Sequence, residues 1–292
     1  MKIVVLGAFG QVGWELQRSL AVLGEVTALG RQEADFADPE GVARTVRALR
    51  PDVIVNAAAH TAVDKAESEP ALAQLLNAAT PAALAREALA LDALLVHYST
   101  DYVFDGSGST ARSEDAPTAP LSVYGRTKLE GERAIAESGC RHLIFRTSWV
   151  YAARGGNFAR TMLRLAQERE RLTVIDDQRG APTGADLIAD VTAHAIRHVQ
   201  QAPHDLGLYH LVASGETSWH GYARFVIDTA RSLRPELPLR ASEIAPVPTS
   251  AFPTPAQRPL NSRLDTSRLQ ERFGLRLPDW QHGVTRMLHE IL

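Results

Sequence analysis

The sequence contains almost no cysteine and lacks long apolar runs. Cys140 is its one cysteine, so no disulfide can form within the chain, and a reducing compartment is favoured. No stretch reaches the roughly 18 apolar residues of a membrane span, so we expect no membrane partner. An apolar, strand-like run, Ile3–Leu6, begins almost at once, so we expect no signal peptide. These absences together predict a cytoplasmic protein.

An excess of charge of one sign is also missing. The 292 residues include 31 Lys and Arg against 34 Asp and Glu, a formal net charge of −3. A protein that binds nucleic acid needs a basic surface, so the composition argues against such a partner. A chain of this length can bury a substantial core and has room for two domains.

A glycine-rich turn follows the first predicted strand. Residues Gly7–Gly13 read G-A-F-G-Q-V-G, and a helical pattern continues after them. Gly7 permits a tight turn, Gly10 lets the backbone approach a phosphate, and Gly13 allows helix and strand to pack closely. The spacing differs from the commoner G-x-G-x-x-G and would be weak evidence alone. Its position directly after a first strand predicts a dinucleotide cofactor.

The second predicted strand, Val26–Leu29, ends without the usual acidic residue. A carboxylate near this point normally binds the adenosine ribose 2′-hydroxyl, but Arg31 stands here instead. A guanidinium suits a 2′-phosphate, which favours NADPH, with NADH use also open. The alternative is a solvated loop arginine. Glu33 and Asp35 lie close by, and a carboxylate turned inward would leave the protein with dual specificity.

Polar residues gather after the fourth predicted strand, Leu94–Tyr98. Ser99–Asp101 fall just past its carboxyl end, where ligands bind in open α/β sheets. Tyr124 and Lys128 follow at a spacing of four, so on a helix they share one face. A nearby ammonium lowers the pKa of a phenol, and Thr100 offers it a second hydrogen bond. This arrangement suits proton transfer.

Each of these residues also has an ordinary structural interpretation. A Tyr-x-x-x-Lys pair alone usually lies on the surface of an amphipathic helix, and only its company favours catalysis. His60 could be a catalytic base, but we favour a pocket wall or a loop hydrogen bond. Arg258 and Arg263, in a proline-stiffened loop, could bind a diphosphate. Pairing with Asp265 or capping of the next helix is the alternative for both.

Strands and helices alternate through the first half of the chain. This pattern predicts a doubly wound parallel sheet, the Rossmann arrangement, over residues 1–148. Residues 149–292 are expected to form mainly a smaller α/β substrate-binding domain, with a return to the sheet near residues 204–232. Asp38 is a predicted helix N-cap with Pro39 at the first helical position, and Pro70–Ala90 a long helix.

Several of these motifs resemble the extended short-chain dehydrogenase/reductase superfamily. They are Gly7–Gly13, Asn56–Ala59, Ser99–Asp101 and the Tyr124/Lys128 pair. Longer runs resemble one family within it, the dTDP-4-dehydrorhamnose reductases. These runs are Gly10–Gln17, Arg50–Glu67, His97–Phe104, Phe145–Tyr151, Gly180–Ala185 and Arg258–Leu264. The match covers nearly the whole chain.

The resemblance implies an NAD(P)H-dependent oxidoreductase. It would reduce the 4-keto group of dTDP-4-dehydro-L-rhamnose, the last step in making dTDP-L-rhamnose for cell-surface polysaccharide. Tyr124 would be the general acid, Lys128 would hold the nicotinamide ribose and lower the tyrosine pKa, and Thr100 would aid the tyrosine. Further cofactor contacts are expected at Gly7, Gly10, Gln11, Val12, Arg31, Asp35, Phe36, Ala59, His60, Thr61 and Tyr98. Substrate contacts are expected at Thr100, Asp101, Trp149 and Arg258.

Alternatives within the superfamily stay open at this point. A nucleotide-sugar epimerase or dehydratase would share the glycines and the Tyr/Lys pair but recycle a bound NAD. A non-catalytic regulatory subunit is the third interpretation, although Thr100, Tyr124 and Lys128 are intact. Trp149 could stack on the sugar or thymine, or lie in the core. Some relatives form metal-bridged homodimers, which leaves a homodimer and a structural Mg²⁺ near Asp186 open; no ligand set for a metal can be named.

Overall fold

Six parallel strands form one sheet in the larger part of the molecule, which the computed structural model describes over residues 1–292. Their spatial order is β10-β5-β4-β3-β1-β2, and every neighbouring pair is parallel. The strands are β1 (Lys2–Leu6), β2 (Glu25–Leu29), β3 (Val53–Asn56), β4 (Leu94–Thr100), β5 (His142–Thr147) and β10 (Gly207–His210). The doubly wound parallel sheet expected from the sequence is confirmed.

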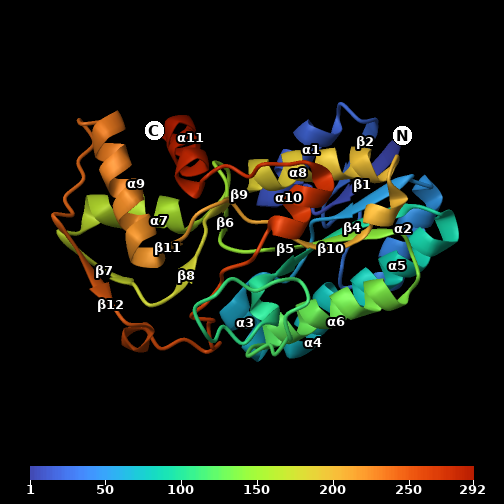
Figure 1. Ribbon diagram of the computed structural model, residues 1–292, viewed down its shortest axis with the longest axis horizontal. Coiled ribbons are helices and arrows are strands. Elements are labelled where there is room, and N and C mark those ends of the chain that lie inside the picture. The colour runs from blue at the N-terminus through green and yellow to red at the C-terminus, as the bar shows by residue number, and fades with distance from the viewer.

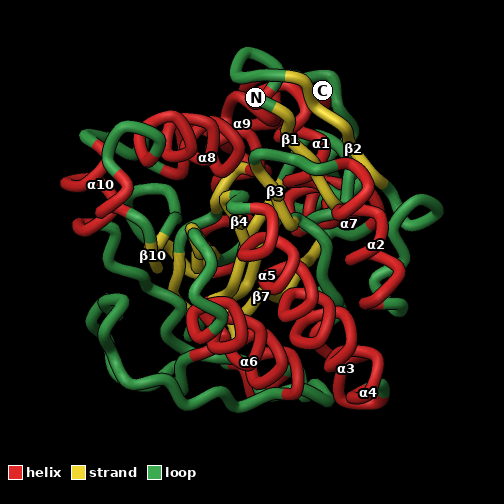
Figure 2. Tube along the Cα trace, turned by 90° about the vertical axis from the view of Figure 1, so that its right-hand side faces the viewer, coloured by secondary structure: helices red, strands yellow, loops and turns green.

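Helices cover both faces of this sheet (Figures 1 and 2). One face carries α1 (Gln11–Leu20), α8 (Ala185–Val199) and α10 (Ser267–Phe273); the other carries α2 (Pro39–Leu49), α5 (Thr80–Leu91) and α6 (Val123–Glu137). Burial on both faces explains why the strands are apolar runs without alternation. No helix combines the length and the apolar composition that a membrane-spanning segment requires.

A smaller part lies at the left of Figure 1 and has its own aromatic core. It contains α7 (Phe158–Glu168), α9 (Trp219–Leu233), α11 (Trp280–Ile291), and the parallel pair β7 (Arg171–Ile175) and β12 (Glu243–Val247). Two short pairs, β6 (Val150–Tyr151) with β9 (Thr183–Gly184) and β8 (Arg179–Gly180) with β11 (Thr217–Ser218), join it to the larger part. Tyr222 and Trp280 pack edge to face at its centre, with ring centroids 5.8 Å apart.

The segment that returns to the sheet differs from the expected residues 204–232. It begins at α8, which packs along α1, and ends with β10, which pairs with β5. Helix α9 instead packs on α7 and α11 in the smaller part. Both helices are amphipathic, so the sequence shows that each buries a face but does not show against which partner.

The long helix expected over Pro70–Ala90 is interrupted. It is divided into α4 (Pro70–Gln74), a π-helical turn (Leu75–Ala79) and α5, and the short α3 (Val63–Ser68) precedes it. Pro81 lies at the start of α5 and cannot donate the next helical hydrogen bond, which accounts for the irregularity. The turn directs the buried side chain of Asn77 toward the main chain of His60 and the hydroxyl of Thr127.

Helix starts and strand ends were predicted more closely. Asp38 caps α2 by accepting a hydrogen bond from the Gly41 N–H at 2.9 Å, with Pro39 at the first helical position, as expected. Strand β4 continues through Thr100, two residues beyond the expected end, so only Asp101 lies past it. Short 3-10 turns occupy Asp101–Val103, Pro203–Asp205 and Thr249–Ala251.

A buried ion pair fastens α6 to the sheet. The Arg146 guanidinium on β5 donates to both carboxylate oxygens of Glu132, at 2.9 and 2.6 Å, and both side chains are almost fully buried. Removing one member of such a pair leaves the other charge buried without a partner. Because α6 also carries Tyr124 and Lys128, this pair helps to set their position.

Glu132→Ala is therefore expected to lower the free energy of unfolding by about 3–5 kcal/mol, since Arg146 would stay buried and unpaired. Glu137→Ala, on an exposed position of the same helix, is the matched control and should change it by less than about 0.5 kcal/mol. Urea unfolding followed by circular dichroism measures both. Similar unfolding midpoints for the two variants would show that the ion pair does not hold the helix in place.

Candidate active site

The glycine turn lies where β1 passes into α1. Gly7 has a φ of +85°, and a Cβ there would be 2.8 Å from the Ala58 nitrogen. A Cβ on Gly13 would be 2.1 Å from the Gly7 oxygen. Larger residues would push the turn away from β3 and from its own helix, so the turn keeps its backbone free to contact a phosphate.

A cavity of about 190 Å³ lies beside this turn. Of the expected cofactor residues, Gly7, Arg31, Asp35, Phe36 and Ala59 line it. Leu72 and Leu76 complete an apolar wall, which suits a flat adenine ring. The fold therefore brings together expected cofactor residues that follow β1, β2 and β3 or lie in the loop before α2.

A carboxylate does stand at the end of β2, but it comes from Glu33. Its Oε2 accepts a hydrogen bond from the Gly30 N–H at 2.9 Å. Arg31 is turned outward, with its side chain 84% exposed and its Nε 3.7 Å from the Asp35 carboxylate. The inward turn of an acidic residue was one of the two arrangements left open by the sequence.

Tyr124 lies in the first turn of α6, which Ser122 caps by accepting from the Gly125 N–H at 3.1 Å. Burial raises the pKa of the Tyr124 phenol above its usual value, the Thr100 hydroxyl acts to lower it, and the Asp101 carboxylate raises it further. The expected lowering of this pKa by Lys128 is wrong for the protein as it stands. The reason is geometric, because the Lys128 amine is directed elsewhere.

Lys128 points into the sheet and not at the phenol. Its Nζ donates to the Tyr98 carbonyl oxygen at 2.6 Å and lies 3.1 Å from Nε2 of His97. The side chain is only 2% exposed, and burial lowers the pKa of Lys128 to about 8, opposed by the charge of Glu132. Helical spacing correctly placed Tyr124 and Lys128 on one face but did not show where the amine ends.

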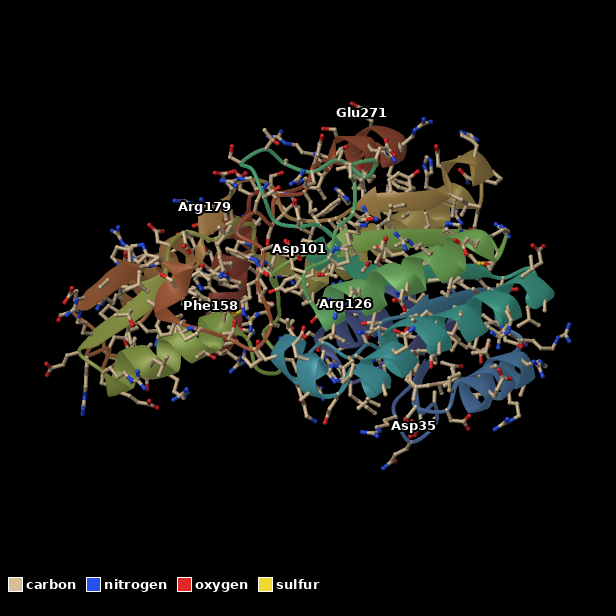
Figure 3. The ribbon with its side chains drawn as sticks, turned by 90° about the horizontal axis from the view of Figure 1, so that it is seen from below. Asp35, Asp101, Arg126, Phe158, Arg179 and Glu271 are labelled. Atoms are coloured by element: carbon tan, nitrogen blue, oxygen red, sulfur yellow. The ribbon has the colours of Figure 1, made fainter.

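Asp101 is a buried acid at the junction of the two parts (Figure 3). One carboxylate oxygen accepts from the Thr100 hydroxyl at 3.1 Å, and the other, Oδ2, has no hydrogen-bond partner in the protein. Burial raises the pKa of Asp101 to about 6, with the hydroxyls of Ser262 and Thr100 acting in the opposite direction. A buried oxygen without a partner is costly, which marks this position as a candidate ligand contact.

Trp149 faces the same junction from the loop after β5. Its ring stacks on Trp219 of α9, with centroids 3.7 Å apart and planes 15° from parallel. Trp149 has a φ of +49°, an unfavourable conformation for a bulky residue that tends to occur at functional sites. Trp219 donates from Nε1 to the Gln178 side chain at 2.9 Å, so its ring is held in place.

Arg258 reaches the active-site tyrosines from the C-terminal loop. Its guanidinium contacts the Asp64 carboxylate at 2.6 Å and the Tyr102 hydroxyl at 3.1 Å. Tyr102 packs edge to face on Tyr124, with centroids 5.5 Å apart. Arg263 is paired with Glu216 and makes no hydrogen bond to Asp64, Tyr102 or Tyr124. Neither arginine pairs with Asp265, the alternative considered from the sequence.

Other expected residues lie outside the cavity. The Tyr98 hydroxyl is 2.8 Å from Thr192 on α8, within the core, whereas the Tyr98 carbonyl accepts from Lys128, so the expected cofactor contact falls to the main chain of Tyr98. His60 is buried with Nε2 3.4 Å from Glu69, which agrees with a loop hydrogen bond. Thr61 is exposed.

The remaining residues expected to bind the phosphates, Gly10, Gln11 and Val12, have three different environments. The Gln11 amide donates to the main chain of the loop after β6, at Arg154 and Gly156, over distances of 3.4 and 3.2 Å. Val12 packs against the core beneath α1. Gly10 is the N-cap of α1 and has an extended backbone.

Asp186 pairs with Arg286 at 3.4 Å. Within this chain, no group of three or more His, Cys, Asp and Glu side chains is arranged to hold a metal ion. The structural Mg²⁺ left open near Asp186 therefore has no ligand set here, and we do not propose this ion.

Sequence reasoning missed several residues that complete the site. They are His97, Asp64, Tyr102 and Trp219, all assigned by contacts between distant segments. Three of them lie within the runs that carry the resemblance, which was the available signal. Trp219 lies outside those runs, and only the packing of α9 reveals it.

Comparisons with known proteins agree along the full length of the chain. The family model described as the RmlD substrate binding domain matches residues 1–292. The dTDP-4-dehydrorhamnose reductase of Shigella flexneri is 60% identical over 295 residues, which cover 100% of this chain and 98% of the relative. The enzyme of the same name from Escherichia coli K12 is 59% identical over the same shares.

Solved structures give the same result. The dTDP-4-dehydrorhamnose reductase of Clostridium acetobutylicum superposes with a TM-score of 0.89 at 33% identity, and the one from Bacillus anthracis in complex with NADP with 0.87 at 32%. Both matches cover 99% of each chain. A Thermus thermophilus UDP-glucose 4-epimerase, at 20% identity and a TM-score of 0.82, shares the fold. The chain thus belongs to the RmlD substrate-binding-domain family, together with the dTDP-4-dehydrorhamnose reductases that it matches.

Proposed function

We propose that this protein reduces the 4-keto group of dTDP-4-dehydro-L-rhamnose to give dTDP-L-rhamnose, using NAD(P)H. The observation that carries the proposal is the position of Tyr124 beside Thr100 and Asp101. These groups meet at the carboxyl end of β4, near the glycine turn of β1. The full-length match to reductases of this name supports the choice of substrate.

The residues present fit a nicotinamide dinucleotide. The main chain of the Gly7 turn and the start of α1 would bind the pyrophosphate, and the cavity at Phe36, Ala59 and Leu72 would take the adenine. Lys128 keeps hydrogen-bonding capacity beyond its contact with the Tyr98 carbonyl, which it would offer to the nicotinamide ribose. When bound, NAD(P)H supplies the hydride for the sugar C4.

Tyr124 would supply the proton. Its phenol has a pKa raised by burial, so it holds its proton at neutral pH and can give it to the oxygen that becomes the hydroxyl. Two electrons and one proton arrive as hydride at carbon, and the second proton comes from Tyr124. The resulting phenolate would be stabilised by Thr100 and later be reprotonated from solvent.

Substrate recognition would come from the junction of the two parts. The unpartnered Oδ2 of Asp101 would accept a hydrogen bond from a sugar hydroxyl, and Trp149 would offer its ring to the sugar. Arg258 would bind a phosphate oxygen of the diphosphate, because a guanidinium can serve Asp64 and an anion from different nitrogens. A reducing, cytoplasmic setting suits the free, buried Cys140 and the consumption of NAD(P)H.

The protein is expected to oxidise one NADPH for each dTDP-L-rhamnose formed, and Tyr124→Phe is expected to lower kcat by at least about a hundredfold. The substitution removes the transferable proton and keeps the ring against Tyr102. Absorbance of NADPH and chromatography of the sugar nucleotide measure the reaction, and cofactor binding by fluorescence checks the variant. An epimerase would convert its sugar with no net NADPH loss. Full turnover in the variant would remove Tyr124 from the mechanism.

Cofactor preference is expected to depend on Arg31 and Glu33 in opposite senses. The exposed Arg31 can pair with the 2′-phosphate of NADPH, whereas the Glu33 carboxylate suits the 2′-hydroxyl of NADH. Arg31→Ala should raise KM for NADPH about tenfold and leave KM for NADH nearly unchanged, with a smaller effect at high salt. Glu33→Gln should raise KM for NADH. Equal ratios of the two constants in wild type and both variants would contradict this assignment.

Arg258→Ala is expected to raise KM for the sugar nucleotide at least tenfold and KM for NADPH less than twofold, because the lost guanidinium faces the diphosphate. Arg263→Ala is the matched control, since that arginine is paired with Glu216 and makes no hydrogen bond to Asp64 or Tyr102. Steady-state kinetics with each substrate varied in turn gives both constants. A parallel rise of both constants for Arg258→Ala would indicate a structural role through Asp64.

A further inference from the structure

A chain of buried hydrogen bonds links the cofactor cavity to Lys128. The Ala58 N–H donates to Oδ1 of Asn56 at 3.1 Å, and Nδ2 of Asn56 lies 3.0 Å from Nδ1 of His97. Nε2 of His97 then lies 3.1 Å from Nζ of Lys128. Asn56, His97 and Lys128 are at most 2% exposed, so water does not compete for these contacts. Ala58 itself lines the cavity.

The hydrogen bonds that run from Ala58 to Lys128 can have only one order of donors and acceptors. A backbone N–H can only donate, so the oxygen of the Asn56 amide faces Ala58 and its NH₂ group faces His97. Nδ1 of His97 must then accept, and the single proton of the neutral imidazole lies on Nε2, directed at Lys128. An ammonium has no lone pair, so this last contact is a hydrogen bond only when Lys128 is an uncharged amine.

We propose that His97 is a positioning residue, which holds the amine of Lys128 and connects it through Asn56 to the main chain at the cofactor cavity. The proposal deepens the proposed reductase function and rests on it. Lys128 would not be placed by helix α6 alone. Its amine would be set by β4 and β3, the same strands that carry Thr100 and the cavity wall.

The charged groups around Lys128 do not hold its amine, which leaves that role to the uncharged side chains of His97 and Asn56. On α6, Glu132 raises the Lys128 pKa, but its carboxylate is already bound to Arg146 of β5. After β4, the Asp101 carboxylate acts on Tyr124, and no carboxylate contacts the Lys128 amine. Burial lowers the pKa of Lys128 to about 8. Only the uncharged amine can accept a hydrogen bond from an N–H on Nε2 of His97, which acts in the same direction. Burial and the Lys128 charge also lower the pKa of His97 well below its usual value, so it stays neutral.

A second buried histidine, His210, makes no side-chain hydrogen bond to a proposed site residue and serves as the comparison for His97. His210 on β10 is fully buried, and neither of its ring nitrogens has a hydrogen-bond partner. It packs edge to face on Phe104, with ring centroids 5.8 Å apart. His97 differs because both of its nitrogens are engaged and one of them meets a proposed catalytic group. His210→Leu is therefore the matched control for His97→Leu.

The test uses Asn56→Asp, which reverses donor and acceptor in the hydrogen bonds that His97 makes with residue 56 and with Lys128. A carboxylate accepts from both the Ala58 N–H and Nδ1–H of His97, which turns Nε2 into an acceptor for the Lys128 ammonium. Lys128 then keeps its proton to higher pH. We expect the apparent pKa of Lys128, followed through the pH dependence of kcat/KM from pH 6 to 10, to move up by at least about one pH unit, a tenfold change in proton affinity. Lys128→Arg should abolish this pH dependence and so identify its source.

The same substitution in a His97→Leu background separates an effect transmitted by the hydrogen bonds of His97 from the direct effect of the added carboxylate charge on Lys128. If His97 transmits the effect, Asn56→Asp should move this apparent pKa by less than a third as much in that background. His97→Leu alone should lower kcat at least tenfold and change KM for the sugar nucleotide less than twofold, whereas His210→Leu should change neither. Circular dichroism and thermal melting confirm that each variant is folded.

Equal shifts from Asn56→Asp with and without His97 would overturn the proposal, because the effect would then be charge acting through space. A wild-type kcat in His97→Leu would overturn it as well, even if Asn56→Asp does not fold. Wild-type protein that fails to oxidise NADPH with dTDP-4-dehydro-L-rhamnose would instead overturn the proposed function. If the wild type is active, and the variants show neither the loss of kcat nor the shift in pH dependence, the proposed function stands and only the role of His97 is removed.

Discussion

The docking of α6 on the central sheet is the constraint on which the rest of this molecule depends. One of its closest contacts is the hydrogen bond from the Lys128 amine to the Tyr98 carbonyl, at 2.6 Å and out of reach of water. A buried amine is unfavourable unless its hydrogen bonds are made, so the position of the helix is sharply defined. Arg146 and Glu132 hold it one turn further along.

This contact also determines what the first turn of α6 presents. Gly131 lets the helix approach the π-helical turn closely, since a Cβ there would be 2.1 Å from the Asn77 oxygen. With the helix held at this depth, the phenol of Tyr124 lies against Thr100 and Asp101. The same residues that stabilise the larger part thus place the Tyr124 phenol, the proposed proton donor, at the carboxyl edge of the sheet.

The junction between the two parts carries features that cost stability. Asp101 has a buried oxygen without a partner, and Trp149 adopts a left-handed backbone conformation. Asp101 lies where the two parts meet (Figure 3), and Trp149 stacks on Trp219 of the smaller part. Unsatisfied groups and backbone strain tend to persist where function requires them, which supports the proposed role of this junction in binding the substrate.

Local pattern was enough to predict much of the fold and part of the site. Alternating strands and helices indicated the parallel sheet, and the glycine spacing indicated the turn after β1, because both depend on residues close together in the chain. The spacing of Tyr124 and Lys128 placed them on one helix face for the same reason. The return to the sheet was expected near residues 204–232, but it consists of α8 and β10 and leaves out α9, since an amphipathic helix does not specify its partner.

What the sequence determined by itself was therefore the set of elements, the family and the residue types at the site. Tertiary structure alone decided that Lys128 turns to His97 and away from Tyr124, that Glu33 supplies the carboxylate at the end of β2, and that Trp219 faces Trp149. The physical reason is that these contacts join side chains far apart in the chain or set by rotamers. They are chosen by burial and hydrogen bonding in the folded molecule, which no local pattern contains.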